Sequence, residues 1–315
     1  MNNCELLTGS TILQAIEWAN QILAKGEICS SKVETEIILG NVCQLRRIEL
    51  YLMHDRQLDQ QEVSRFSDLV YRRIDGEPLQ YLTGVSEFYG RSFSVTPAVM
   101  IPRPETEMIV DLVRPFLEKR TGQEWHKEGL SQYSTKLNDY PVKFADIGTG
   151  SGVLSVTLTL EFPSVTCYAT DISGSAIKVA RENAKALSVE NYRLYFLQGF
   201  LLDPLIDDGI FDLDLIVSNP PYIATKELDR LPKEIRSYEP QAAFDGGENG
   251  LEVFSQLINN ISKCLKVGGM IVLEIGATQS SAVTHLMIAS GVYESINTVK
   301  DYNGLDRFIT AIYVG

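Results

Sequence analysis

The second half of the chain alternates apolar, strand-like segments with segments of helical periodicity. The strand-like segments are VKFADIG, VTCYATDI, YRLYFLQG, LDLIVSN, MIVLEIG, ESINTVKD and RFITAIYV. Helical periodicity falls near residues 153–161, 174–187, 250–266 and 278–290. This alternation is typical of an α/β fold with a doubly wound parallel sheet. Because only YNG separates the last two strands, we expect them to pair as an antiparallel hairpin at the edge of a seven-stranded, mostly parallel sheet.

The residues before this alternation follow a different pattern. From residue 9 to about 76, apolar positions recur at helical spacing, which predicts a small N-terminal helical domain over residues 1–80. Aromatic and β-favouring residues around Tyr89-Gly90-Arg91 predict a hairpin linker over residues 81–103. The large domain then covers residues 104–315. Within it, Lys119–Pro141 is polar and aperiodic, so we expect a long exposed connection or insertion there.

Composition narrows the classes of function. The chain has 315 residues, of which 44% are hydrophobic, and a net charge of −13. The sequence shows no secretory leader and no run of about 18 apolar residues, so we expect no membrane contact and a cytoplasmic location. Five scattered cysteines and three unclustered histidines argue against a disulfide frame and against a metal site. Acidic residues outnumber basic ones, 41 to 28, so few positive side chains are available to form a basic surface for nucleic acid.

A glycine-rich turn follows the first strand of the predicted sheet. The sequence FADIGTGSGVL places Asp146 at the strand end and Gly148, Gly150 and Gly152 in a turn that leads into a helix. Glycines allow a tight bend there and let a ligand lie against the backbone near a helix N-terminus. The G-x-G-x-G spacing differs from the G-x-G-x-x-G fingerprint of dinucleotide-binding proteins.

An acidic residue ends the next strand. Asp171 lies nineteen residues beyond Gly152, where a carboxylate can accept hydrogen bonds from both ribose hydroxyls of an adenine nucleoside. The alternatives are a structural turn without a ligand, and a helix N-cap role for Asp171. The two features together, in order after two successive strands, favour nucleoside binding.

The fourth strand ends abruptly at Asn219-Pro220-Pro221-Tyr222. Two prolines cannot continue a sheet ladder, because each lacks an N–H group and has a fixed φ angle. They can hold the polar groups of a neighbour in one pose. Since ligands of such sheets bind at the carboxyl ends of the strands, this tetrapeptide should face the same crevice as Gly148 and Asp171. A proline-stiffened loop with an Asx turn is the alternative interpretation.

With these motifs in place, the chain resembles the enzymes that transfer methyl groups from S-adenosyl-L-methionine. More narrowly, it is similar to the peptide chain release factor glutamine methyltransferase family, also called HemK or PrmC. The motifs that carry this resemblance are GEPLQYLTG, FYG, IPRPETE, DIGTGSG, SNPPYI, YEPQAAFDGG and GLDRF. The tetrapeptide alone is shared with methylases of adenine in DNA and of guanine in RNA.

The resemblance implies a class I, Rossmann-like methyltransferase domain over residues 104–315 and the following roles. Residues implied to bind the cofactor are Asp146, Gly148, Thr149, Gly150, Ser151, Gly152, Asp171, Phe200, Leu201 and Asn219. Residues implied to hold the amide that is methylated are Asn219, Pro220, Pro221 and Tyr222. The family usually has an aspartate where Phe200 stands, so we hypothesise that Phe200 lies against the adenine; filling the core is the alternative.

The tetrapeptide suits the chemistry of a methylated amide. An amide nitrogen is a poor nucleophile because its lone pair is delocalised into the carbonyl. If the Asn219 side-chain oxygen and the Pro220 carbonyl accept its two hydrogens, the lone pair can be localised and aimed at the methyl carbon. Tyr222 would supply an aromatic wall beside the cationic sulfonium.

Three functions remain open from the residues alone. The first is methylation of the glutamine side chain in the Gly-Gly-Gln loop of release factors, as protein substrates. The second is methylation of an amino group of adenine or guanine in nucleic acid, which the acidic balance disfavours. The third is a nucleoside-binding module without catalysis, which the intact tetrapeptide disfavours. In IPRPETE, Arg103 and Glu105 could line the substrate entrance or belong to a surface acid cluster, and we expect Glu274 to be structural or to anchor a loop.

Overall fold

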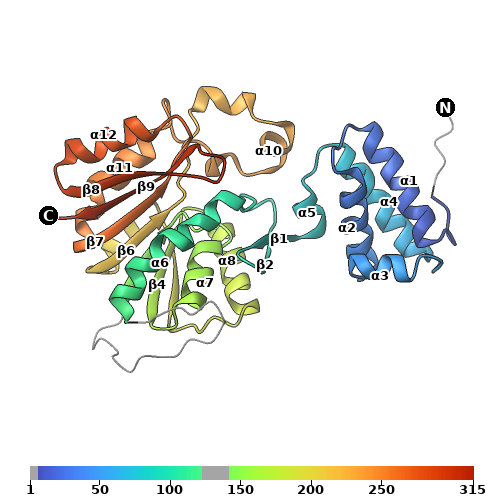
Figure 1. Ribbon diagram of the computed structural model, residues 1–315, viewed down its shortest axis with the longest axis horizontal. Helices are drawn as coiled ribbons and strands as arrows, with labels where there is room; N and C mark the ends of the chain where they lie inside the picture. The colour runs from blue at the N-terminus through green and yellow to red at the C-terminus, as the bar shows by residue number, and fades with distance from the viewer. Residues whose placement is uncertain (1–5, 123–141) are drawn as a thin grey trace. The chain divides into compact units, whose positions relative to one another are not determined.

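The structure is a computed structural model that describes residues 6–122 and 142–315. These residues form two units, which can be followed by colour in Figure 1. The helical unit comprises the described residues up to Val85 together with Pro232–Tyr238. The sheet unit comprises the described residues of Ser86–Leu231 and Glu239–Gly315. Most of the predicted connection, residues 123–141, lies outside the described residues.

The helical unit packs amphipathic helices around one apolar core. Its helices are α1 (Ile12–Lys25), α2 (Ser31–Cys43), α3 (Arg47–Leu52), α4 (Gln60–Ile74), α5 (Leu79–Thr83) and α10 (Lys233–Tyr238). Thr11 and Asp59 begin α1 and α4 with capping boxes, in which each side chain accepts a hydrogen bond from the backbone three residues on. Ile12, Ile38 and Phe66 are fully buried between the helices.

An ion cluster around the buried Arg73 brings α10 into the helical unit. The guanidinium of Arg73, whose side chain is 7% exposed, donates to Glu34 and, at 2.7 Å, to Glu234 of α10. The Tyr238 hydroxyl donates to the Asp75 carbonyl at 3.4 Å. The sequence periodicity of residues 1–80 gave no sign of this addition, because α10 lies about 150 residues further along the chain.

A seven-stranded sheet forms the centre of the sheet unit, in the order β5-β4-β3-β6-β7-β9-β8. Its strands are β3 (Val142–Ile147), β4 (Val165–Asp171), β5 (Leu194–Gln198), β6 (Leu213–Ser218), β7 (Leu265–Glu274), β8 (Tyr293–Lys300) and β9 (Asp306–Tyr313). The first five in spatial order are parallel, while β9 pairs antiparallel with both β7 and β8. The predicted α/β fold with a mostly parallel sheet and a closing antiparallel hairpin is confirmed.

Helices cover both faces of the sheet (Figure 1). One face packs against α6 (Met108–Thr121), α7 (Val153–Glu161) and α8 (Gly174–Ala186), with Phe144 and Val217 in this core. The other face packs against α9 (Asp203–Asp207), α11 (Glu252–Asn260) and α12 (Ser280–Ser290), with Ile147 and Ile216 in the second core. Neighbouring strand residues alternate between the two cores, because successive side chains of a strand point to opposite faces.

The expected helix over residues 250–266 is shorter in the structure. α11 ends at Asn260, a 3-10 turn covers Ile261–Lys263, and β7 already begins at Leu265. The apolar run of the strand follows so closely that helical periodicity alone did not separate the two elements.

A small hairpin precedes the large sheet. β1 (Val85–Phe88) and β2 (Arg91–Ser94) are joined through Tyr89 and Gly90, whose φ angles of 50° and 70° suit a tight two-residue turn. Asn183 of α8 holds β2, since its side chain accepts from the Ser94 N–H and donates to the Ser94 carbonyl.

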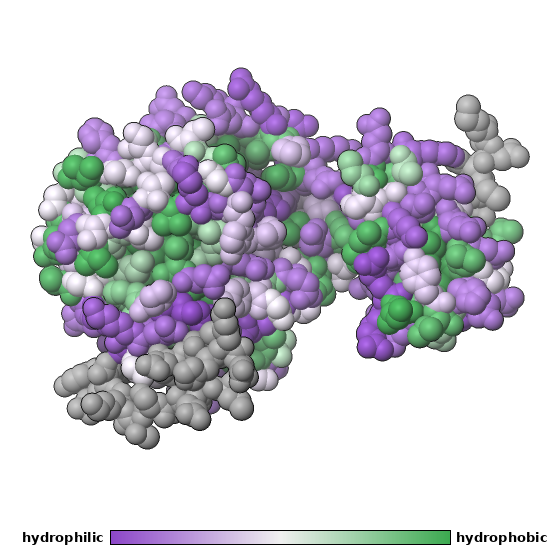
Figure 2. All heavy atoms as spheres, viewed as in Figure 1, coloured by the Kyte–Doolittle hydropathy of each residue, from purple (hydrophilic) through white to green (hydrophobic). Residues whose placement is uncertain are grey.

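Hydrophilic residues cover much of the surface that Figure 2 shows, among scattered apolar ones. None of the helices in the described ranges has the length and apolar character that a bilayer span needs.

Candidate active site

The glycine-rich turn lies between β3 and α7 and depends on backbone angles that glycine adopts easily. The φ angles of Gly148, Gly150 and Gly152 are 74°, 56° and 84°. At Gly152 a side chain would also meet Ala180, because a Cβ built there would lie 3.0 Å from the Ala180 Cβ. The N–H groups of Gly148 and Thr149 donate to the Thr170 carbonyl of β4, which fixes the turn beside the neighbouring strand.

Asp146, near the end of β3, fixes this turn through hydrogen bonds. Its carboxylate is 1% exposed and accepts hydrogen bonds from the Thr149 hydroxyl at 2.6 Å and from the Ser155 N–H at 3.0 Å. Burial raises the pKa of Asp146 to about 6, against the lowering effect of these hydrogen bonds. Its bonds inside the turn indicate that Asp146 shapes the site.

Asp171 connects the turn to the start of α8. One carboxylate oxygen accepts from the Gly150 N–H at 2.9 Å and the other from the Ser173 N–H at 2.9 Å. Burial raises its pKa, while the two backbone hydrogen bonds oppose the shift. A carboxylate has about four lone-pair sites, so two N–H donors leave acceptor capacity for two hydroxyls.

The tetrapeptide follows β6 and is fixed on several sides. The Ser218 hydroxyl donates to the Ile147 carbonyl at 2.7 Å, so the strand end is joined to β3. The Gln279 side chain donates to the Tyr222 carbonyl at 3.0 Å. Gly246 lies directly against it, since a Cβ there would come within 2.8 Å of the Pro221 carbonyl oxygen. The loop is therefore held by segments far away in the sequence.

Asn219 presents its oxygen unpaired. Its Nδ2 donates to the Thr106 hydroxyl at 3.3 Å. Within residues 6–122 and 142–315, neither the Asn219 Oδ1 nor the Pro220 carbonyl accepts a hydrogen bond. Two consecutive residues beyond β6 thus each carry an acceptor without a partner among the described residues.

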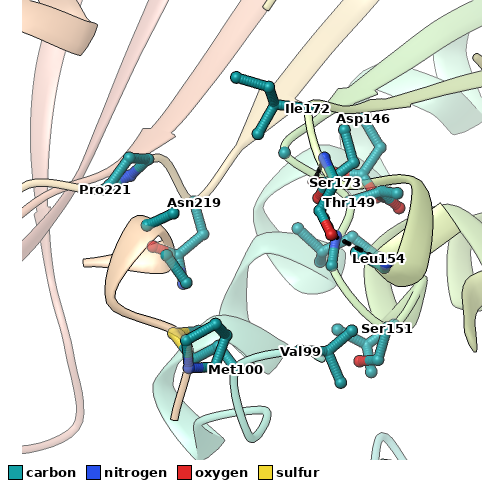
Figure 3. Close-up of a pocket in the computed structure, with 18 of the residues that line it drawn as sticks. Val99, Met100, Asp146, Thr149, Ser151, Leu154, Ile172, Ser173, Asn219 and Pro221 are labelled. Carbon is teal, nitrogen blue, oxygen red and sulfur yellow. Dashed lines mark hydrogen bonds between the residues drawn. The ribbon is translucent and has the colours of Figure 1, made fainter. Parts of the chain in front are cut away.

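A cavity of about 210 Å³ joins these motifs. Figure 3 shows Asn219 and Pro221 on one side of it and Asp146, Thr149 and Ser173 on the opposite side. The predicted site residues that line the cavity are Asp146, Gly148, Thr149, Gly150, Ser151, Asp171, Leu201, Asn219 and Pro221. The other predicted residues are not part of this lining: Gly152, Phe200, Pro220 and Tyr222. Phe200 is 39% exposed, and its contact with a base stays a prediction.

Two further segments line the cavity, whereas the sequence had pointed only to Arg103 and Glu105 of IPRPETE for its entrance, and neither of these is a lining residue. The two segments are Ala98–Met100 and Pro102, with Thr106 beyond, and the residues Pro240, Ala242 and Ala243. The buried Glu239 carboxylate joins them, because it accepts from the Ile101 N–H at 2.9 Å and from Arg103 at 2.7 Å. The signal was present in the motifs IPRPETE and YEPQAAFDGG, but nothing in either motif shows that the two meet.

Comparisons with known proteins agree with this geometry. The family model described as the PrmC N-terminal domain matches residues 14–84, and the model described as the methyltransferase small domain matches residues 134–236. A release factor glutamine methyltransferase of Moorella thermoacetica is 39% identical over 96% of this chain and 98% of its own length. Proteins of the same name from Nitratidesulfovibrio vulgaris and Bacillus cereus are 36% and 34% identical over 96% and 95% of the chain, and 95% and 98% of their own lengths. The chain belongs to the release factor glutamine methyltransferase family.

Solved structures support the fold of this family member. The hMettl16 catalytic domain, in complex with a 3'UTR hairpin, superposes with a TM-score of 0.51 over 82% of this chain and 84% of its own, at 14% identity. That likeness shows the methyltransferase fold. The chain is an S-adenosyl-L-methionine-dependent methyltransferase, and the resemblance inferred from its motifs is confirmed.

Proposed function

We propose that this methyltransferase modifies the side-chain amide nitrogen, N5, of the glutamine in the Gly-Gly-Gln loop of peptide chain release factors. The reaction would take place in the cytoplasm, where release factors act on ribosomes. The names of the relatives support a release factor as the substrate. The observation that carries the proposal is the Asn219 carboxamide, which Thr106 holds at the edge of the cavity and whose oxygen has no hydrogen-bond partner among the described residues.

The residues of the cavity fit S-adenosyl-L-methionine. Gly148 and Gly150 offer backbone without side-chain bulk for the methionine end, and Asp171 retains acceptor capacity for the ribose hydroxyls. Ile172 and Leu201 supply apolar surface for the base, and we assign Phe200 to the same region. When bound, the cofactor supplies a methyl group on a sulfonium, whose positive charge makes that carbon electrophilic.

The tetrapeptide would activate and orient the acceptor amide. The Asn219 Oδ1 and the Pro220 carbonyl would accept the two amide hydrogens, so that the nitrogen lone pair is localised and directed into the cavity. The two prolines restrict the backbone and keep both acceptors in place, which is preorganisation. Burial raises the pKa of the Tyr222 hydroxyl, so this ring remains neutral near pH 7 and can serve as an aromatic wall.

Proton loss needs no dedicated base in this scheme. An N-methylated, protonated amide is a strong acid, so its proton passes to solvent once the methyl group has been transferred. The selectivity lies in the carboxamide itself. Asn219 can accept from the substrate N–H while it donates to the substrate carbonyl, a pairing that a glutamate side chain cannot complete.

The proposal is tested by supplying labelled S-adenosyl-L-methionine with one of three substrates: a release factor, its Gln→Glu variant, or bulk DNA and RNA. We expect label in the unaltered release factor alone. Label in nucleic acid would support the alternative of an adenine or guanine amino-methyltransferase. Equal label in the Gln→Glu variant would show that another side chain is the acceptor.

A further inference from the structure

Three side chains from distant parts of the sequence form a hydrogen-bonded chain behind the tetrapeptide. Glu274, at the end of β7, is 2% exposed and accepts from the Thr106 hydroxyl at 2.7 Å. Thr106 lies in a 3-10 turn, Pro104–Glu107, and is 3% exposed. Its hydroxyl oxygen accepts in turn from the Asn219 Nδ2 at 3.3 Å. This series of hydrogen bonds ends at the Asn219 side-chain amide, which faces the substrate amide in the proposed function.

The direction of these hydrogen bonds follows from how many hydrogens each group carries. An ionised carboxylate only accepts, and a threonine hydroxyl has a single hydrogen. With that hydrogen directed to Glu274, Thr106 can only accept from Asn219, so the amide NH2 must face Thr106. This fixes which end of the Asn219 carboxamide is nitrogen, a choice that geometry alone leaves open.

We infer that Thr106 and Glu274 are positioning residues that hold the Asn219 carboxamide with Oδ1, and not NH2, toward the acceptor nitrogen. The inference rests on the proposed function, since it concerns an acceptor that presents an N–H group. In the reversed orientation the Asn219 NH2 would face the acceptor NH2. Both groups are donors, so no hydrogen bond could form between them. Neither the glycine-rich turn nor Asp171 takes part in this hydrogen-bonded series, so the cofactor contacts assigned to those residues are separable from it, although Thr106 and Asn219 line the same cavity.

The protonation state of Glu274 determines the direction of the hydrogen bonds from Glu274 through Thr106 to Asn219. Burial raises its pKa to about 7 and Glu105 adds to the shift, while the Thr106 hydrogen bond and the charges of Arg307 and Arg103 oppose it. Tyr222 also faces this carboxyl group. Once protonated, Glu274 can donate to Thr106, and the Thr106 hydrogen is then free to point at Asn219. The orienting effect therefore weakens as the pH falls through about 7 and strengthens as the pH rises through it.

The first test compares Thr106→Val, which keeps the shape but removes the hydroxyl, with Thr106→Ser, which keeps the hydroxyl. Thr157→Val is the matched control, because Thr157 is also fully buried and its hydroxyl has no partner among the described residues. We expect Thr106→Val to lower kcat about 10- to 100-fold with little change in cofactor Kd, as a misplaced reacting group would. Thr106→Ser should restore most of the rate, and Thr157→Val should match the wild type in kcat.

Two results would overturn the inference at this step. One is a Thr106→Val enzyme with a kcat within about twofold of the wild type, well short of the loss a misplaced group causes. The other is an equal loss in Thr106→Val and Thr106→Ser together with a lowered Tm and weakened cofactor binding, which would assign Thr106 a structural role. If the wild type itself fails to label a release factor, the proposed function has failed instead.

The second test follows kcat against pH in the wild type and in Glu274→Gln. The wild-type rate should rise with pH around 7, as Glu274 ionises. This rise should disappear in Glu274→Gln, which cannot ionise, while cofactor binding measured by calorimetry at each pH is the same in the variant as in the wild type. A rise that persists unchanged in Glu274→Gln would contradict the role of Glu274.

Discussion

The two sides of the cavity are built differently. On the cofactor side, Asp146 bonds Thr149 and Ser155, three and nine positions away, and Asp171 bonds the Gly150 N–H, 21 positions away. On the acceptor side, Thr106 bonds Asn219 across 113 positions and Glu274 across 168. The hydrogen bonds of the glycine-rich turn thus lie within one local β-turn-α-β module, whereas those of the acceptor side join residues more than 100 positions apart. We therefore expect substitutions on the acceptor side to lower kcat and substitutions on the cofactor side to weaken cofactor binding, each with little effect on the other.

The largest expected effect is on the acceptor side. Asn219→Ala removes the oxygen that accepts the substrate hydrogen, so we expect kcat to fall by about 100- to 1,000-fold, the range for losing one preorganised partner of a reacting group. Cofactor Kd should remain within about threefold, because the bonds of the glycine-rich turn are left intact. Steady-state kinetics and calorimetry measure the two effects. Asn259→Ala, at an exposed position on α11, is the control; a parallel loss of cofactor affinity in Asn219→Ala would break the separation.

The next effect is on the cofactor side. Asp171→Ala removes the carboxylate that would hold the ribose, and hydrogen bonds to a charged group contribute about 1.5–3 kcal/mol, or roughly 10- to 150-fold in Kd. Calorimetry with the cofactor measures this loss, and a melting curve reports the cost of releasing the Gly150 and Ser173 N–H groups. Asp208→Ala, just beyond α9, serves as the control. Unchanged cofactor affinity would remove Asp171 from the site.

A smaller effect should come from the ion pair that joins the two unassigned segments. Glu239→Gln keeps the shape but removes the charge that holds Arg103, and its side chain is only 2% exposed. Since Pro102 and Pro240 both line the cavity, we expect cofactor Kd to rise about 5- to 20-fold, with a modest fall in Tm. If Kd is unchanged while Tm falls, the pair supports the fold without shaping the cavity.

The smallest effect concerns the adenine. Phe200 is already 39% exposed, so Phe200→Ala should hardly change Tm, and a rise of a few-fold in cofactor Kd would place the ring against the base. Leu201→Ala is the comparison, because Leu201 lines the cavity and also packs against the second core. A lower Tm with unchanged cofactor Kd in Phe200→Ala would assign that ring to packing.

This difference in construction also explains what the sequence could predict. The turn Gly148–Gly152, Asp171 and the tetrapeptide are each marked by short patterns at strand ends, and the alternation of strands and helices places those ends at one edge of the sheet. Glu274 was expected to be structural or a loop anchor; its hydrogen bond to Thr106 depends on the order of β6, β7 and β9, which no local pattern encodes. The same holds for Glu239, whose partner lies 138 positions away, and for α10 in the helical unit.

The most direct test of the account is the position of the transferred methyl group. A release factor treated with the wild-type enzyme and with Asn219→Ala, each saturated with S-adenosyl-L-methionine, would be digested and sequenced by tandem mass spectrometry. The account predicts one methyl group on the side-chain nitrogen of the Gly-Gly-Gln glutamine with the wild type, and almost none with Asn219→Ala despite bound cofactor. A methyl group on any other atom, or equal methylation by Asn219→Ala, would contradict it.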